Sequence, residues 1–201
     1  MTFISIEGCE GSGKTTQAKI LQEKLISLNH KVILTKEPGG SKFGEKMREI
    51  LLLDEIQDSM TEFLLLSAAR RDHILEIQKA LKNGSIVITD RFSDSSLAYQ
   101  GYAKGLNIEE IEYITKIVTG NIMPKITILL NISLNIMQQR IMNRKGKKTF
   151  YDQKGIEFHE KVKNGFLEIA KKYPERIVTV NADLSVQEVS EEIFKIVSKN
   201  L

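Results

Sequence analysis

Five short segments rich in β-branched residues, separated by longer helical patterns, constrain this chain more than any other feature. Their middles are almost continuously apolar rather than alternating, which is typical of strands buried on both faces of a sheet. The predicted strands are Thr2–Glu7, Lys31–Thr35, Ser85–Asp90, Lys125–Asn131 and Arg176–Val180. The predicted helices are Lys14–Leu28, Lys42–Leu53, Thr61–Leu81, Ile108–Thr119, Ser133–Asn143, Ile156–Lys172 and Val186–Lys199. We therefore expect an α/β fold in which a five-stranded parallel sheet is flanked by helices on both faces.

The length and the balanced charge of the chain indicate one globular domain. No repeat, low-complexity tract or Pro- or Ser-rich linker marks a second unit, so residues 1–201 are predicted to form a single domain. The 29 Lys and Arg against 26 Asp and Glu leave a net charge of +3. This balance does not suit a partner that is bound mainly by neutralising phosphates along a duplex. We therefore expect no nucleic-acid partner.

The N-terminus and the cysteine content favour the cytoplasm. Glu7 and Glu10 lie beside a short apolar stretch, whereas a signal peptide needs basic residues followed by a longer apolar run. No stretch approaches the roughly 20 apolar residues that cross a bilayer. Cys9 is the only cysteine, so it cannot form an intrachain disulfide, which suits a reducing compartment. We expect a cytoplasmic protein without a membrane partner.

A glycine-rich loop follows the first predicted strand and opens the first predicted helix. It fits the pattern of Gly, four residues, then Gly-Lys and Ser or Thr, whose backbone amides cradle nucleotide phosphates. The helix N-terminus adds positive potential, Lys14 supplies charge to the β- and γ-phosphates, and the Thr15 hydroxyl is placed to bind Mg²⁺. Cys9 is interpreted as a small residue in a tight loop rather than a nucleophile. The residues predicted to bind the nucleotide phosphates are Gly8, Cys9, Glu10, Gly11, Ser12, Gly13, Lys14, Thr15 and Thr16.

A phosphate loop predicts a ligand but not a reaction, because switch proteins, motors and kinases all use one. The Asn-Lys-x-Asp motif with which GTP-binding switches read guanine is not in the sequence. At the end of the third predicted strand, Asp90 can hold Mg²⁺ directly or through water. Arg91 beside it can bridge phosphates through its planar guanidinium. The alternative for this pair is an ordinary ion pair at a strand end.

Two adjacent arginines interrupt apolar stripes in the predicted helix Thr61–Leu81. Helical spacing places Arg70 in one stripe and Arg71 in the neighbouring one. A charge inside an apolar stripe needs an anionic or polar partner. Spacing alone leaves open which of the two arginines faces inward.

Several segments of the sequence, spread along nearly the whole chain, together resemble those of the bacterial thymidylate kinases. The resemblance implies a P-loop fold with a short basic lid, and it implies a homodimer. It also implies that ATP, with Mg²⁺, is the phosphoryl donor and dTMP the acceptor. The segments that carry it are Phe3–Thr16 (FISIEGCEGSGKTT), Thr35–Gly44 (TKEPGGSKFG), Ala68-Ala69-Arg70, Asp90-Arg91-Phe92 and Ser95–Gly101 (SSLAYQG).

The resemblance also implies roles for individual residues. Glu37 matches an acidic residue near the transferring phosphates and the metal. Arg48 matches the arginine that grips the acceptor phosphate, and Arg70 one that contacts both the acceptor base and the phosphate region. The base and nucleoside pocket is implied for Ser96, Tyr99 and Gln100, where the plain alternative is a polar helix N-terminus with one packed tyrosine.

The sequence departs from the family pattern at two places. Leu66 stands where the family usually has a phenylalanine stacked on thymine, which implies weaker base affinity or selectivity. Relatives with Glu in the phosphate loop, here Glu10, usually supply a lid arginine from an Asp-Arg-x-Glu stretch, which here reads Thr-Phe-Tyr-Asp. The lid is expected at about residues 144–155, and the candidates for its missing guanidinium or charge are Arg144, Arg140, Lys147 and Lys148.

The reaction implied is transfer of the γ-phosphoryl group of MgATP to the 5′-phosphate of dTMP, giving ADP and dTDP. A monophosphate acceptor is already anionic, so it needs cations that hold two repelling phosphates in line rather than a strong base. The alternatives are another deoxynucleoside or nucleoside monophosphate kinase, and a P-loop ATPase switch. The predicted catalytic residues are Lys14, Arg91, Glu10 and Arg144, and the predicted metal ligands are Thr15 and Asp90.

Overall fold

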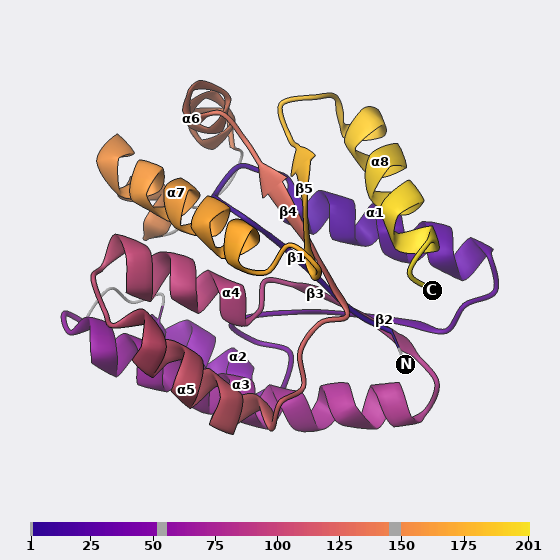
Figure 1. The fold of residues 1–201 in the computed structure, drawn as a ribbon, viewed down its shortest axis with the longest axis horizontal. Coiled ribbons are helices and arrows are strands. Elements are labelled where there is room, and N and C mark those ends of the chain that lie inside the picture. The colour runs from indigo at the N-terminus through magenta and orange to yellow at the C-terminus, as the bar shows by residue number, and fades with distance from the viewer. Residues whose placement is uncertain (1, 52–55, 145–149) are drawn as a thin grey trace.

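The structure is a computed structural model that describes residues 2–51, 56–144 and 150–201 (Figure 1). Five parallel strands form one sheet in the order β2-β3-β1-β4-β5. The strands are β1 (Phe3–Gly8), β2 (Val32–Lys36), β3 (Ile86–Asp90), β4 (Ile126–Asn131) and β5 (Ile177–Asn181). The predicted five-stranded parallel sheet is confirmed, with strand limits shifted by one residue at some ends.

Helices cover both faces of the sheet, as expected (Figure 1). On one face α1 packs against α8, and on the other lie α3, α4 and α7, with α5 packed on α3. Helix α2 packs on α3, and α6 on α7. The helices are α1 (Lys14–Ser27), α2 (Lys42–Leu51), α3 (Ser59–Lys82), α4 (Ser93–Ser96), α5 (Ile108–Thr119), α6 (Leu134–Met142), α7 (Ile156–Lys172) and α8 (Val186–Ser198).

The sheet supplies the centre of the core. Ile4, Ile6, Ile88 and Ile128, on the three inner strands, are fully buried. The outer strands β2 and β5 are only partly covered, so the expectation of burial on both faces is wrong for these two. An edge strand has a neighbouring strand on one side only, so less of it is shielded from solvent.

Three short helical segments, of which the first is α4, were not expected from the sequence. The chain continues from α4 directly into a π-helix, Leu97–Ala103, and a 3₁₀ turn covers Tyr151–Gln153. All the residues of α4 are polar (Ser-Asp-Ser-Ser), so no apolar stripe of period 3.6 marks it. Within the described ranges, none of the helices has the length and apolarity to span a bilayer.

Strand register decides where the polar residues gather. Ile6 of β1 pairs with Asp90 of β3, so the loop after β1 begins beside the Asp90-Arg91 pair. Lys36, at the end of β2, also pairs with Asp90, which brings the following Glu37-Pro38 segment to the same edge. The carboxyl ends of β1, β2 and β3 thus meet at one edge of the sheet, where open α/β folds bind ligands.

Candidate functional site

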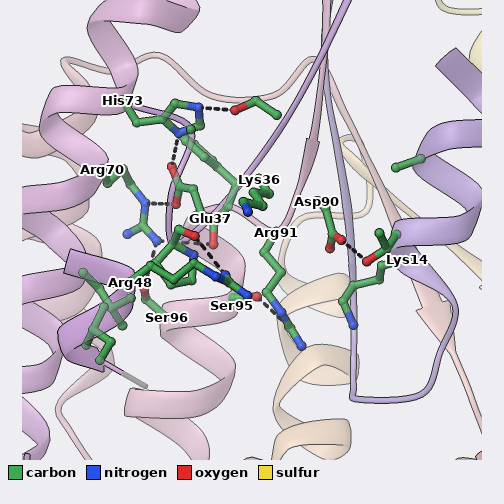
Figure 2. A pocket seen from close by; sticks show the side chains of 18 of the residues that line it. Lys14, Lys36, Glu37, Arg48, Arg70, His73, Asp90, Arg91, Ser95 and Ser96 are labelled. Atoms are coloured by element: carbon green, nitrogen blue, oxygen red, sulfur yellow. Dashed lines mark hydrogen bonds and ion pairs between the residues drawn. The ribbon is translucent and has the colours of Figure 1, made fainter. Parts of the chain in front are cut away.

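A cleft of about 830 Å³ opens at this edge of the sheet (Figure 2). It extends from the phosphate loop past α2 and α3 to the segment after α6, and it brings together residues far apart in the sequence. The predicted site residues that line it are Glu10, Lys14, Thr15, Glu37, Arg48, Leu66, Arg70, Asp90, Arg91, Ser96, Tyr99, Gln100 and Arg144. The other phosphate-loop residues do not line it; these are Gly8, Cys9, Gly11, Ser12, Gly13 and Thr16.

The phosphate loop is shaped by glycine at its two ends. Gly8 has φ +143°, and a Cβ there would lie 2.6 Å from the Leu130 carbonyl oxygen, so only glycine fits against β4. Gly13, with φ +93°, caps α1 without a side-chain hydrogen bond. The first amides of α1 therefore have no side-chain acceptor at the cap and are available to an anion.

Lys14 is buried and folded onto its own loop. Its Nζ donates to the Cys9 carbonyl oxygen at 2.7 Å. Burial, and then repulsion by Arg91, lowers the pKa of Lys14 to about 8. The Cys9 thiol has its pKa raised to about 12 by burial and by the charge of Glu10, which agrees with its interpretation as an unreactive loop residue.

Thr15 and Asp90 place two side-chain oxygen atoms side by side. The Thr15 hydroxyl donates to Asp90 Oδ2 at 2.5 Å, which places the start of α1 against the end of β3. Magnesium prefers hard oxygen ligands and usually takes only one or two from the protein, with substrate phosphates and water completing the shell. Across the described residues no three acidic, His or Cys side chains gather as a metal site by themselves. The pair therefore fits a metal ion that arrives with a nucleotide.

Arg91 ties the phosphate loop to the segment that follows β3. Its backbone has φ +72°, the left-handed region that residues with a side chain rarely adopt. Its guanidinium donates to the Gly8 carbonyl oxygen at 3.0 Å, Ser95 Oγ at 3.1 Å, Glu10 Oε1 at 3.0 Å and Tyr99 Oη at 3.0 Å. Strain of this kind persists where surrounding contacts hold it, and it is common in active sites.

Glu10 is the buried counterpart of Arg91. Burial opposes its ionisation, but His159, at 3.6 Å, and the charge of Arg91 outweigh burial and lower the pKa of Glu10 to about 2. The Tyr99 hydroxyl also donates to this carboxylate at 2.7 Å. Glu10 therefore carries its charge at neutral pH and holds Arg91 and Tyr99 in place.

A second buried charge pair lies on the other side of the cleft. Arg70 Nε donates to Glu37 Oε2 at 2.7 Å, and His73 Nδ1 lies 3.0 Å from Glu37 Oε1 (Figure 2). Burial alone would raise the pKa of Glu37, but Arg70 and His73 lower it. Arg70 Nη2 donates to Ser96 Oγ at 3.1 Å, whereas Nη1 is buried without a partner among the described residues.

The structure thereby answers which arginine of α3 faces inward. Arg70 is 3% exposed, while Arg71 is exposed and donates to the Val118 carbonyl oxygen of α5. Arg48 of α2 reaches the cleft from the side and donates to the Pro38 carbonyl oxygen at 3.0 Å. Both Arg48 and Arg70 thus bring positive charge to the wall opposite the phosphate loop.

Aromatic and polar side chains share the end of the cleft where Gln100 meets Tyr151. Leu66 and Tyr99 line it together with Phe150 and Tyr151. Gln100 is 2% exposed, and its Oε1 has no hydrogen-bond partner in the described part of the chain. A buried polar atom without a partner costs free energy unless a ligand satisfies it. This end therefore suits a planar ring that carries a polar edge.

Two of the four candidate lid cations, Arg144 and Arg140, lie within the described residues, and they make different contacts. Arg144 Nη1 donates to both carboxylate oxygens of Asp152, at 3.0 Å and 2.7 Å, and lines the cleft. Arg140 instead donates to the Gly11 carbonyl oxygen of the phosphate loop at 3.3 Å, and it does not line the cleft. Lys147 and Lys148 lie outside the described residues.

Sequence reasoning missed the polar residues that support the site from behind. Glu7, inside β1, accepts from the Phe92 amide at 2.7 Å and from Ser95 Oγ at 2.6 Å. Burial and the nearby charge of Asp94 raise the pKa of Glu7 to about 8. In the sequence, Glu7 stands out only as an acidic residue in an otherwise apolar strand. His73, which contacts Glu37, follows Arg70 by three residues, a spacing that places both side chains on one face of a helix.

The raised pKa of Glu7 predicts a pH-dependent stability. The folded state binds the Glu7 proton more tightly than the unfolded chain, whose pKa is about 4.5. The resulting stabilisation is complete below pH 4.5 and is lost as the pH rises to about 8. The free energy of unfolding of the native protein, relative to Glu7→Gln, should therefore fall between these values. Urea unfolding of both proteins across this pH range checks it, with the exposed Glu168→Gln as control, and parallel curves for native and Glu7→Gln would contradict it.

Sequence and structure comparisons find similar proteins that match nearly the whole chain. The family model described as Thymidylate kinase matches residues 6–193. The chain is similar to the thymidylate kinases of Syntrophotalea carbinolica, at 40% identity, and Lactobacillus helveticus, at 42%; each match covers 99% of this chain and 96% of the relative. It is also similar to the crystal structure of thymidylate kinase from Ehrlichia chaffeensis, with a TM-score of 0.81, 34% identity and 98% of both chains covered.

Proposed function

Because the chain belongs to the thymidylate kinase family, whose model covers residues 6–193, we propose the following division of labour for the phosphorylation of dTMP by ATP. A phosphate oxygen of dTMP attacks the γ-phosphorus of ATP, and the bond from that phosphorus to the β–γ bridging oxygen breaks. The products are ADP and dTDP, which serves dTTP synthesis. The observation that carries the proposal is one continuous cleft with a phosphate loop at one end and an arginine-lined, aromatic pocket at the other.

The phosphate loop binds the ATP phosphates. Amides of the loop from Gly8 to Thr16 and the N-terminus of α1 donate to phosphate oxygens. Lys14 exchanges its contact with the Cys9 carbonyl for the β- and γ-phosphates, where charge spreads during transfer. An arriving phosphate also favours the charged form of Lys14, whose pKa burial lowers to about 8.

Thr15 and Asp90 would hold Mg²⁺ together with the ATP phosphates. When bound there, the ion neutralises charge on the phosphates and orients them. The Thr15 hydroxyl and the Asp90 carboxylate are the protein's part of this site, and they already lie in contact.

Arginines bring the acceptor phosphate to the donor. Arg48 and Arg70 grip the phosphate of dTMP, and Arg91 lies between the two nucleotides beside the phosphate loop. Glu37 orients Arg70, and Glu10 orients Arg91, in each case through a buried ion pair. Arg144 reaches the transferred group from the lid. Holding two repelling phosphates in line is the main catalytic task, because the acceptor is already anionic.

The aromatic end of the cleft takes the thymidine moiety. Tyr99 and Leu66 contact the nucleoside, while Ser96 and Gln100 face the polar edge of the base. Leu66 offers an aliphatic contact where an aromatic ring would stack, which weakens base affinity or selectivity.

A panel of acceptors tests the proposed reaction. With MgATP, dTMP should accelerate ADP production far more than thymidine, dUMP, dCMP or no acceptor. Equal rates with thymidine or another monophosphate would favour a different nucleoside or nucleoside monophosphate kinase. If no acceptor changes the rate of ADP production but a protein partner raises it, the result would favour an ATPase switch.

Arg91→Lys tests the need for a planar guanidinium between the nucleotides. Lysine keeps the charge but cannot reach the Gly8 carbonyl, Ser95, Glu10 and Tyr99 together, so kcat for dTMP should fall on the order of 100-fold. Steady-state kinetics measures this, and thermal melting confirms folding. The control is Lys171→Arg, the reverse exchange at an exposed position of α7 away from the cleft, which should leave kcat unchanged. A kcat for Arg91→Lys within about threefold of the control would remove the guanidinium from the mechanism.

The proposal extends to a cytoplasmic homodimer. Exposed apolar side chains on the outer surface of α3 and α5, namely Leu64, Leu75, Tyr113 and Ile117, support a second copy as the partner. Light scattering should give twice the monomer mass of 22.8 kDa, and a monomeric mass at micromolar concentration would contradict it.

A further inference from the structure

A chain of four polar side chains leads from the protein surface to the base end of the cleft. We call it the polar relay: Lys104, Glu62, Tyr151 and Gln100. The Lys104 ammonium pairs with Glu62 Oε2, and the Tyr151 hydroxyl donates to Glu62 Oε1. Gln100 Nε2 donates to the Tyr151 oxygen at 3.3 Å. The members come from α3, the π-helix, the residue after it, and the lid.

The Glu62 carboxylate determines which group donates and which accepts at each hydrogen bond of the relay. A carboxylate can only accept, so the single proton of the Tyr151 hydroxyl is directed to Glu62. The Tyr151 oxygen is then left to accept, and an accepting partner requires the NH₂ group of Gln100 rather than its carbonyl. Burial, and then the charge of Glu62, raises the pKa of Tyr151, so its hydroxyl stays protonated and able to donate.

This order leaves one atom of Gln100 without a partner. The side chain is 2% exposed, and among the described residues its Oε1 makes no hydrogen bond while Nε2 is taken by Tyr151. Gln100, Tyr151 and Glu62 all line the cleft. The base end therefore presents a buried acceptor whose orientation another residue determines.

We propose that Tyr151 and Glu62 are positioning residues that fix the Gln100 amide so that its carbonyl oxygen selects a pyrimidine bearing a hydrogen on ring nitrogen N3. Thymine and uracil carry that N–H, whereas cytosine has a bare acceptor nitrogen there and would face the Gln100 oxygen acceptor to acceptor. A site built to satisfy a hydrogen bond rejects a ligand that leaves its buried polar group unpaired. The inference rests on the proposed function only in placing the acceptor base at this end of the cleft.

Tyr151→Phe tests the relay because it removes the hydroxyl and keeps the ring. Without that hydroxyl the amide can turn over and offer Nε2 to the cytosine N3, since the two orientations have the same shape. The dissociation constants of dTMP, dUMP and dCMP are measured by calorimetry without ATP. The preference for dTMP over dCMP should fall at least about tenfold, while the preference for dTMP over dUMP stays unchanged because both carry the N3 hydrogen.

The chain offers a matched control in a second Lys-Glu-Tyr cluster. Tyr173 donates to Glu112 at 2.6 Å, and Lys172 pairs with the same carboxylate, away from the cleft. Tyr173→Phe should leave all three dissociation constants unchanged. Glu62→Gln gives an independent variant, because the new amide can donate to the Tyr151 oxygen and release the tyrosine proton toward Gln100. This variant should lower the binding preference for dTMP over dCMP, as Tyr151→Phe does.

The outcomes separate the inference from the proposed function. If Tyr151→Phe folds and its ratio of dissociation constants for dTMP and dCMP is unchanged, the relay is overturned, whether or not the enzyme is active. If Tyr151→Phe does not fold, the same result in Glu62→Gln overturns it. Native protein that binds dTMP selectively without dTMP-dependent ADP production overturns the proposed function alone. Equal loss of affinity for all three nucleotides in both variants assigns Tyr151 a packing role and also overturns the relay.

Discussion

The buried ion pair between Arg91 and Glu10 is the interaction on which the rest of the site depends. It joins the phosphate loop after β1 to the segment after β3, and both residues are mostly withdrawn from solvent. Removing either partner would leave the other charge buried and uncompensated, which is costly. The same guanidinium donates to the Gly8 carbonyl, Ser95 and Tyr99, so one side chain holds the phosphate loop against the segment that follows β3.

The wall opposite is built on the same principle with different residues. Glu37 receives Arg70 and His73, and His73 also meets the Thr35 hydroxyl at 2.7 Å. Behind both walls, Asp94 accepts two hydrogen bonds from Arg176, at 2.7 Å and 2.8 Å. The buried atoms that stay unpaired among the described residues of the cleft are Arg70 Nη1 and Gln100 Oε1, and their side chains line the space that a substrate would fill.

Much of this could be predicted from the sequence because its signals are local. Apolar, β-branched strands indicated the parallel sheet, and the glycine pattern with Lys14 and Thr15 located the phosphate loop. Strand ends indicated Asp90 and Arg91, because parallel strands bring their carboxyl ends to one edge. Arg48, Glu37, Ser96 and Gln100 were reached only through resemblance to a family.

The remainder depends on contacts between residues distant in the chain. Helical spacing could not choose between Arg70 and Arg71, since the choice depends on Glu37, 33 residues away. No periodic pattern of apolar residues marks the π-helix in the sequence. Tyr151 donates to Glu62, which lies 89 positions away in the chain, so no local pattern indicates this contact. The orientation of Glu7 within its strand could not be read from the sequence, because it depends on the Phe92 amide and the Ser95 hydroxyl.

The central claim is that two anionic nucleotides occupy one cleft together, end to end. The most direct test is calorimetric titration of dTMP into the protein alone and into protein saturated with Mg²⁺ and a non-hydrolysable ATP analogue. We expect one dTMP bound per chain in both titrations, with the analogue still in place. Displacement of one nucleotide by the other would contradict the claim, because both would then compete for a single phosphate site.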